Sequence, residues 1–344
     1  MLLDVTYGRP PSDTGGAAGS AERAGADGVW VGETYSDPFL KALQAAEATR
    51  RVTIGTAVAI AFARTPMTVA YAANDLALAS DGRFVLGLGT QVRSHVERRF
   101  AMPWSDPIPR MREFIAALRA IWAAWHEGAP LAFAGDFYSH SLMTPFFTPD
   151  ATPAAPIPVY LAAVGDAMAA LAGETSDGLI FHPFTTPKYM EAVTLTAVAR
   201  GAQRAGRDPR EVAIAGPVFV CVGRDDQEIA VAREASRSQL AFYASTPSYR
   251  AVLELHGWGD LQPELGDLAR RGEWKALGDA ISDEVLDEFA VTGTPEDVVV
   301  DLETRWGALA DRVSLYMPYE VPDATRDALL HAHRQRADAP AQQR

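Results

Sequence analysis

The sequence predicts an α/β protein, a (β/α)8 TIM barrel with insertions after the fourth and seventh strands. One observation is a repeated order of helix, glycine-containing turn and buried apolar strand, which is clearest where 83–91 follows Ser80-Asp81-Gly82. A second is that most of the expected strands are followed by a helix. An open doubly wound sheet is the competing fold, but Tyr7-Gly8-Arg9-Pro10-Pro11 lacks the glycine pattern expected in its first turn.

Short apolar runs, several rich in β-branched residues, predict the strands. The expected strands are 2–7, 28–33, 52–60, 83–91, 158–163, 177–182, 212–222 and 311–317. Asp37-Pro38, Thr65-Pro66, Thr186-Pro187 and Thr294-Pro295 each combine an N-cap with a proline in the first helical turn. The helix before strand two is expected to run from Gly15-Gly16 to Ala26, and Pro217 to mark a bulge or bend.

Two long excursions interrupt this rhythm. The first, from Val92, is polar to residue 106 and then includes a helix over 109–125 with one broad apolar stripe and a hairpin around Gly135-Asp136. The second, 245–290, is expected to form short helices. A last helix covers roughly 323–333. We therefore expect a single domain over 1–335 and a disordered tail over 336–344.

Composition narrows the function. The net charge of −13 argues against nucleic acid as a partner, and no apolar run is long enough for a membrane span. Histidine spacing predicts no metal site, and the single cysteine, Cys221, excludes an internal disulfide. The N-terminus lacks the basic start of a signal peptide, so a cytoplasmic protein is expected. The chain has only three lysines, none closing a strand, which disfavours Schiff-base chemistry.

Active sites of this fold lie at the carboxyl ends of the strands. Those ends are mostly apolar, small or neutral, which suits a flat cofactor that performs the chemistry itself. Glu33, His182 and Tyr7 are the candidate catalytic residues, although Glu33 could equally be a solvated surface carboxylate and His182 a structural residue. The glycines in Leu86-Gly87-Leu88-Gly89 indicate either a close ligand or tight packing against a neighbouring strand.

The turn Gly165-Asp166-Ala167-Met168 begins a helix directly after the fifth strand. Its free backbone N–H groups could bind a phosphate, and an ordinary helix start is the alternative interpretation.

Several of these segments resemble the luciferase-like monooxygenase family. They are Ala21 to Glu33, Arg51 to Val58, Ser80 to Gly89 and Pro158 to Ala163. The tracts His95-Val96-Glu97-Arg98-Arg99-Phe100 and Ser245-Thr246-Pro247-Ser248-Tyr249 resemble its deazaflavin (coenzyme F420)-dependent oxidoreductases. The similarity covers about 1–335, and other branches of the family use FMN.

The resemblance implies a cofactor at the barrel mouth and often a homodimer. A non-proline cis peptide of the family matches Ala57-Val58, and its phosphate contacts match Thr90, Gln91 and the turn after Ala163 and Val164, namely Gly165, Asp166, Ala167 and Met168. Two departures stand out. Glu33-Thr34 replaces the Asp-His pair that often ends strand two, and Val92 occupies the position of a glutamate that donates a proton in a sugar-phosphate dehydrogenase branch.

The resemblance thus implies a coenzyme F420-dependent oxidoreductase that transfers hydride between the cofactor and a small organic substrate. An FMN-dependent monooxygenase using reduced flavin and O2 is the first alternative. A non-catalytic deazaflavin- or flavin-binding protein is the second, because the family acid is absent at Val92.

Overall fold

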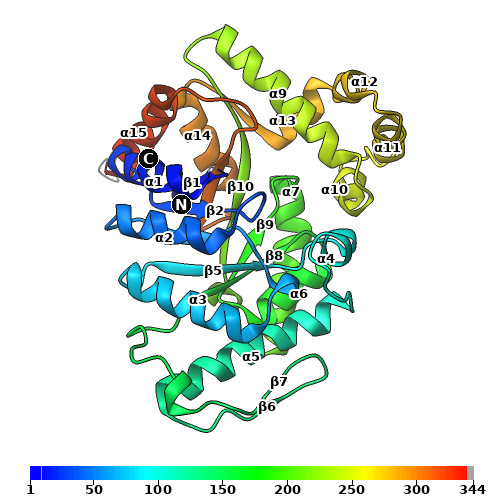
Figure 1. Cartoon of the computed structure of the whole chain (residues 1–344). Coiled ribbons are helices and arrows are strands. Elements are labelled where there is room, and N and C mark those ends of the chain that lie inside the picture. The colour runs from blue at the N-terminus through cyan, green and yellow to red at the C-terminus, as the bar shows by residue number, and fades with distance from the viewer. Residues whose placement is uncertain (9, 339–344) are drawn as a thin grey trace.

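A computed structural model describes residues 1–8 and 10–338 of the chain. Parallel strands form a closed barrel at its centre, and helices surround the barrel (Figure 1). This architecture confirms the predicted (β/α)8 barrel. The barrel strands, in order around the ring, are β1 (Leu2–Tyr7), β2 (Gly28–Val31), β3 (Thr53–Thr56) with β4 (Ala59–Ile60), β5 (Phe84–Gly89), β8 (Val159–Ala163), β9 (Gly178–Phe181), β10 (Ala213–Val222) and β12 (Arg312–Tyr316).

Helices pack on the outside of the barrel, and their apolar faces and the outward faces of the strands form the main core. These helices are α1 (Pro11–Ala24), α2 (Pro38–Ala48), α3 (Pro66–Ala79), α5 (Pro107–Glu127), α6 (Asp166–Thr175), α7 (Pro187–Tyr189), the π-helix η3 (Met190–Leu195), α8 (Thr196–Arg204), α14 (Pro295–Trp306) and α15 (Asp323–Asp338). The predicted caps are present: Asp37, Thr65, Thr186 and Thr294 each accept a backbone N–H in the first turn of a helix.

Three local predictions need correction. The first helix begins at Pro11, so Gly15 lies inside α1 and does not precede it. This glycine allows close packing against α2, since a Cβ there would lie 3.1 Å from the Gln44 carbonyl oxygen. Pro217 makes no bulge. It pairs with Ser314 in a continuous register, and since β9 pairing ends at Ala215 one edge of β10 is free at this point, which tolerates a proline.

The third correction is an extra strand, β11 (Ala290–Gly293), which begins at the last residue of the segment 245–290 expected to form short helices and continues through three residues for which no element was expected. It pairs in parallel with Phe219 to Val222, the outer half of β10. The last helix also continues past His333 to Asp338, and the rest of the expected disordered tail, 339–344, lies outside the described residues.

The first insertion, between β5 and β8, contains α5 and also α4 (Arg93–Arg98), which lies within the stretch expected to be a polar excursion. The predicted hairpin around Gly135-Asp136 is present as β6 (Phe133–Ala134) and β7 (Ser139–His140). A 3-10 turn η2 (Pro145–Phe147) follows. Within the described residues, no helix is long and apolar enough to span a membrane.

The second insertion follows β10 and forms a separate lobe, at the upper right of Figure 1. A second apolar core holds it together and continues onto the outer half of β10. Its elements are α9 (Asp226–Ala244), the 3-10 turn η5 (Pro247–Tyr249), α10 (Arg250–Leu255), α11 (Leu261–Arg271), α12 (Trp274–Asp279) and α13 (Asp283–Phe289).

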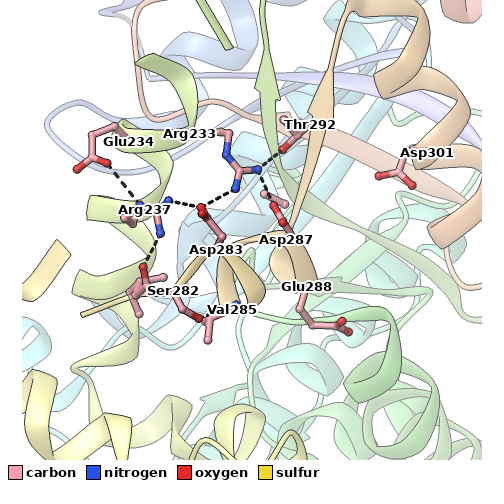
Figure 2. A network of polar contacts seen from close by, with 12 residues as sticks. Arg233, Glu234, Arg237, Ser282, Asp283, Val285, Asp287, Glu288, Thr292 and Asp301 are labelled. Carbon is pink, nitrogen blue, oxygen red and sulfur yellow. Dashed lines mark hydrogen bonds and ion pairs between the residues drawn. The ribbon is translucent and has the colours of Figure 1, made fainter. Parts of the chain in front are cut away.

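Ion pairs clamp the first and last helices of this lobe together. Figure 2 shows Arg233 and Arg237 of α9 reaching Asp283 at the start of α13, at 2.8 and 2.6 Å. Arg233 also binds Asp287 one turn later. These contacts join the middle of α9 to α13.

Candidate active site

The barrel interior is filled by side chains that alternate with the outer core along each strand. They form a small cluster of Trp30, Val85 and Ile180, against which Ala57, Val58, Tyr160 and Ala162 pack. Nearer the carboxyl ends, the same inward faces carry Gly89 on β5 and His182 just after β9. At the barrel mouth, the end of β5 therefore contributes no inward side chain, and the end of β9 contributes an imidazole.

The two glycines of β5 have different causes. A Cβ on Gly87 would lie 1.8 Å from the Thr56 carbonyl oxygen, and the Thr56 hydroxyl also bonds the Gly87 backbone. Tight packing against a neighbouring strand therefore explains Gly87. A Cβ on Gly89 would instead lie 2.6 Å from the Val58 side chain, so Gly89 makes room for the segment that divides β3 from β4.

That dividing segment contains a cis peptide between Ala57 and Val58, as the family resemblance implied. Glu33 holds the chain directly after it. The Glu33 carboxylate accepts the Ile60 N–H at 2.8 Å and the Arg64 guanidinium at 2.6 Å, and its side chain is only 6% exposed. Glu33 therefore lies beyond the end of β2, and its carboxylate is hydrogen-bonded to groups of the same chain.

The turn into α6 fits an anionic group. Val164, Gly165, Asp166 and Ala167 are exposed, and no side chain caps the helix at Gly165. The first N–H groups of α6 are therefore available at its positive end. The Asp166 carboxylate would oppose an anion, but Arg200 pairs with it at 2.6 Å.

The other residues implied as cofactor contacts are placed differently. Thr90 and Gln91 are half-buried just after β5, and Gln91 has a positive φ of 61°. Ala163 is buried in the outer core, so its side chain faces the helices while the neighbouring Ala162 faces inward. Only the backbone of Ala163 can therefore contact a molecule at the barrel mouth.

Tyr7 also faces outward. Its ring is buried in the core beneath α1, and its hydroxyl donates to the Ala17 carbonyl at 3.2 Å. The inward face of β1 is instead formed by Asp4, whose carboxylate binds Arg312 and Trp30, and by the exposed Thr6. Tyr7 and the mouth are thus on opposite faces of the same strand.

His182 is the predicted candidate whose side chain lies at the mouth. Its Nδ1 accepts the Phe184 N–H at 3.1 Å, and its Nε2 lies 3.1 Å from the Tyr249 hydroxyl. The two rings stack with centroids 4.7 Å apart. Burial lowers the pKa of His182 to about 4, so the imidazole is neutral at pH 7.

Two further tyrosines complete this wall. Tyr243 of α9 packs edge-on against His182, and its hydroxyl lies 2.6 Å from that of Tyr316, at the end of β12. Burial raises the pKa of Tyr243 and of Tyr316, and together with Tyr243 it raises that of Tyr249 to about 12. All three phenols are therefore protonated at neutral pH.

Sequence reasoning did not assign a role to Tyr249, Tyr243 or Tyr316. Tyr316 closes an expected strand, and Tyr249 lies in a tract that resembles the deazaflavin enzymes, so both carried a signal. Tyr243 carried none, because nothing local indicates that the end of α9 returns to the mouth.

The comparisons with known proteins agree with this architecture. The family model described as luciferase-like monooxygenase matches residues 3–312. An uncharacterised protein of Mycobacterium tuberculosis is 50% identical over 314 residues, covering 91% of this chain and 92% of the relative. The 5,10-methylenetetrahydromethanopterin reductase of Methanolobus tindarius is 32% identical over 282 residues, covering 80% and 81%.

Among solved structures, the coenzyme F420-dependent tetrahydromethanopterin reductase of Methanopyrus kandleri superposes with a TM-score of 0.78 at 20% identity, covering 96% of this chain and 97% of that one. At this identity the likeness speaks for the fold. The family match and the sequence relatives together establish that this chain is an enzyme of the luciferase-like monooxygenase family.

Proposed function

We propose that this protein is a coenzyme F420-dependent oxidoreductase that transfers hydride between the deazaflavin and a small organic substrate. The observation that carries the proposal is the composition of the mouth: an uncapped helix start at Gly165, an apolar floor at Val58 and a wall of neutral aromatic groups. The coenzyme F420-dependent structural neighbour, which shares this fold, supports the same cofactor.

The described residues fit such a cofactor. The first N–H groups of α6, with Thr90 and Gln91, would hold its phosphate, and Ala57-Val58 would support its ring. The deazaflavin, when bound, supplies the hydride acceptor or donor. Glu33 contributes by fixing the segment after Ala57-Val58, since its carboxylate binds Ile60 and Arg64.

A direct titration tests the cofactor. We expect fluorescence titration with oxidised F420 to give saturable binding to the purified protein, much tighter than FMN under the same conditions. Ala167→Pro removes one of the proposed phosphate donors and should weaken binding. Tight binding of FMN without binding of F420 would favour the monooxygenase alternative and contradict the proposal.

We also propose a homodimer, as is frequent in the resembled family. Leu40 of α2 and Leu78 of α3 support an interface on this side, since their side chains are 58% and 41% exposed. Sedimentation velocity should give twice the chain mass, and the pair Leu40→Arg with Leu78→Arg should give the monomer. A monomeric wild type at micromolar concentration would contradict this state.

A further inference from the structure

We propose that the Tyr249 hydroxyl donates the proton in a reduction, that His182 positions it, and that the substrate is an uncharged compound with a C=O or C=N bond on an apolar body. This inference rests on the proposed function and deepens it. It starts from the hydrogen bonds of His182.

The two nitrogens of His182 have different roles. The Phe184 N–H can only donate, so His182 Nδ1 at 3.1 Å must accept. A neutral imidazole carries one proton, which must then be on Nε2. The bond of 3.1 Å between Nε2 and Tyr249 therefore runs from the imidazole to the phenol oxygen.

Tyr249 consequently keeps its own hydroxyl hydrogen for another acceptor. Among residues 1–8 and 10–338, His182 is the hydrogen-bond partner recorded for that hydroxyl. Its location follows from His182, which shares the inward face of β9 with Ile180 and lies beyond it toward the mouth. The free hydrogen is thus at the barrel mouth, where a substrate would lie.

The Tyr249 ring is held from several sides. His182 stacks on it, and Phe184 packs against it with centroids 5.3 Å apart. The lobe that carries it is tied to the barrel as well: the Thr186 hydroxyl lies 2.8 Å from His256 Nε2, and Lys188 donates to the Leu255 carbonyl at 3.0 Å. Tyr249 is therefore preorganised, as proton donation requires.

Other groups near the mouth are less suited to this role. Glu33 already binds Ile60 and Arg64, and the exposed Val92 is apolar. Tyr243 and Tyr316 bond each other at 2.6 Å, so one of their two hydrogens is already used. The neutral phenols and the apolar Val58, Val92 and Val164 explain why an uncharged substrate is expected.

The chemistry balances for a reduction. A bound reduced deazaflavin would supply the hydride for a C–H bond at the carbonyl or imine carbon, and the π electrons of the double bond would move to the oxygen or nitrogen. That atom takes the Tyr249 proton, giving an alcohol or amine. The phenolate left behind accepts the His182 Nε2–H bond until solvent returns a proton. The reverse oxidation would need a base, which a protonated phenol does not provide.

A spectroscopic experiment tests the donor without requiring turnover. Carbonyl-13C acetophenone is titrated into the wild type, Tyr249→Phe and Tyr71→Phe, each with and without oxidised F420. The carbonyl resonance should move downfield in the wild type because its oxygen accepts a hydrogen bond. Tyr249→Phe should lose this shift. Tyr71→Phe should keep it, since Tyr71 on α3 bonds the Phe147 carbonyl away from the mouth.

A second variant tests the positioning role. His182→Phe keeps a stacking ring but removes the Nε2–H that orients the Tyr249 hydroxyl, so the downfield shift should become smaller without being lost. With reduced F420 as the hydride donor, Tyr249→Phe should slow acetophenone reduction by about 100-fold, the lower range for a general acid.

The outcomes separate the two proposals. A wild type that does not bind F420 contradicts the proposed function. If F420 binds but acetophenone shows no downfield shift, or the shift persists in Tyr249→Phe, the present inference is wrong and the cofactor assignment stands. A shift lost only in Tyr249→Phe supports Tyr249 as the donor.

Discussion

At the scale of single residues, the two glycines of β5 show how one sequence pattern serves two purposes. Gly87 is required by the backbone of the neighbouring strand, since the Thr56 carbonyl oxygen occupies the space of a Cβ. Gly89 faces a side chain, that of Val58, beside the proposed ring position. The backbone of a packed barrel strand cannot move away from an added Cβ, whereas a side chain such as that of Val58 can change its position.

These surroundings predict opposite results for two alanine substitutions. Gly87→Ala should lower the free energy of unfolding by at least about 3 kcal/mol, because the clash is with backbone. Gly89→Ala should cost only about 1 kcal/mol but raise the Kd for F420 about tenfold, because Val58 must move toward the cofactor. Urea denaturation and fluorescence titration measure the two quantities. Equal effects on stability would show that Gly89, too, is only a packing residue.

At the scale of elements, the position of α6 depends on how closely α8 approaches it. A Cβ on Gly201 of α8 would lie 1.8 Å from the Ala170 carbonyl oxygen of α6, and one on Gly173 of α6 would lie 2.1 Å from the Val198 carbonyl oxygen. The helices therefore meet backbone to backbone. The start of α6, where the phosphate is proposed to bind, is held in place by this contact.

Gly201→Ala should push the two helices apart. We expect a loss of about 1–3 kcal/mol in unfolding free energy and weaker F420 binding, even though Gly201 is remote from the cofactor. Gly16→Ala in α1 is the matched control, since a Cβ there meets nothing within 4 Å, and it should stabilise by up to about 1 kcal/mol. Unchanged stability of Gly201→Ala in a urea titration would refute the close-contact argument.

The docking of α15 predicts a pH dependence. Burial alone would raise the pKa of Asp27, but hydrogen bonds from His333 and the Leu3 N–H outweigh it and hold that pKa below its usual value. A lowered folded-state pKa contributes stability above the unfolded-state pKa of about 3.9, and this contribution is lost as the pH falls through the folded-state pKa.

Asp27→Asn should therefore be less stable than the wild type at pH 7, and the difference should shrink below about pH 4. Glu303→Gln, which changes a more exposed pair with Arg336 on the same helix, is the control and should have little effect at pH 7. Guanidinium denaturation at several pH values measures both. A difference that stays constant down to pH 3 would exclude Asp27 as the titrating group.

At the scale of the whole molecule, the barrel closes through residues from opposite ends of the chain. Asp4 of β1 binds Arg312 of β12 through both carboxylate oxygens, each at 2.8 Å, and also accepts the Trp30 indole N–H at 2.7 Å. The Asp4 side chain is 1% exposed. Closure thus joins the first and last strands by a buried ion pair with two hydrogen bonds.

Asp4→Asn leaves the Arg312 charge buried without its partner and should destabilise the protein by about 3–5 kcal/mol at pH 7. The double variant Asp4→Asn with Arg312→Met should recover part of that loss, because no unpaired charge remains. Urea denaturation of both single variants and the double variant gives the coupling. Strictly additive losses would mean that the two residues do not stabilise closure as a pair.

Local sequence was sufficient for much of the fold. Alternation, glycine turns and the N-caps at Asp37, Thr65 and Thr294 act over a few residues, so they identified the barrel strands and their helices. The same local rules missed β11, a short strand inside a helical lobe, and the start of α1, where glycines reflect contact with α2.

The sequence by itself determined that the mouth would be poor in free charge and would lie at the strand ends around Gly89, Gly165 and His182. Only the tertiary structure decided which side chains face it. One step in strand alternation places Tyr7 outside, and a long-range pair binds Glu33 to Arg64. The second insertion returns Tyr249 to His182. Local patterns constrain the facing of a strand, but contacts between distant segments exist only once the barrel has closed.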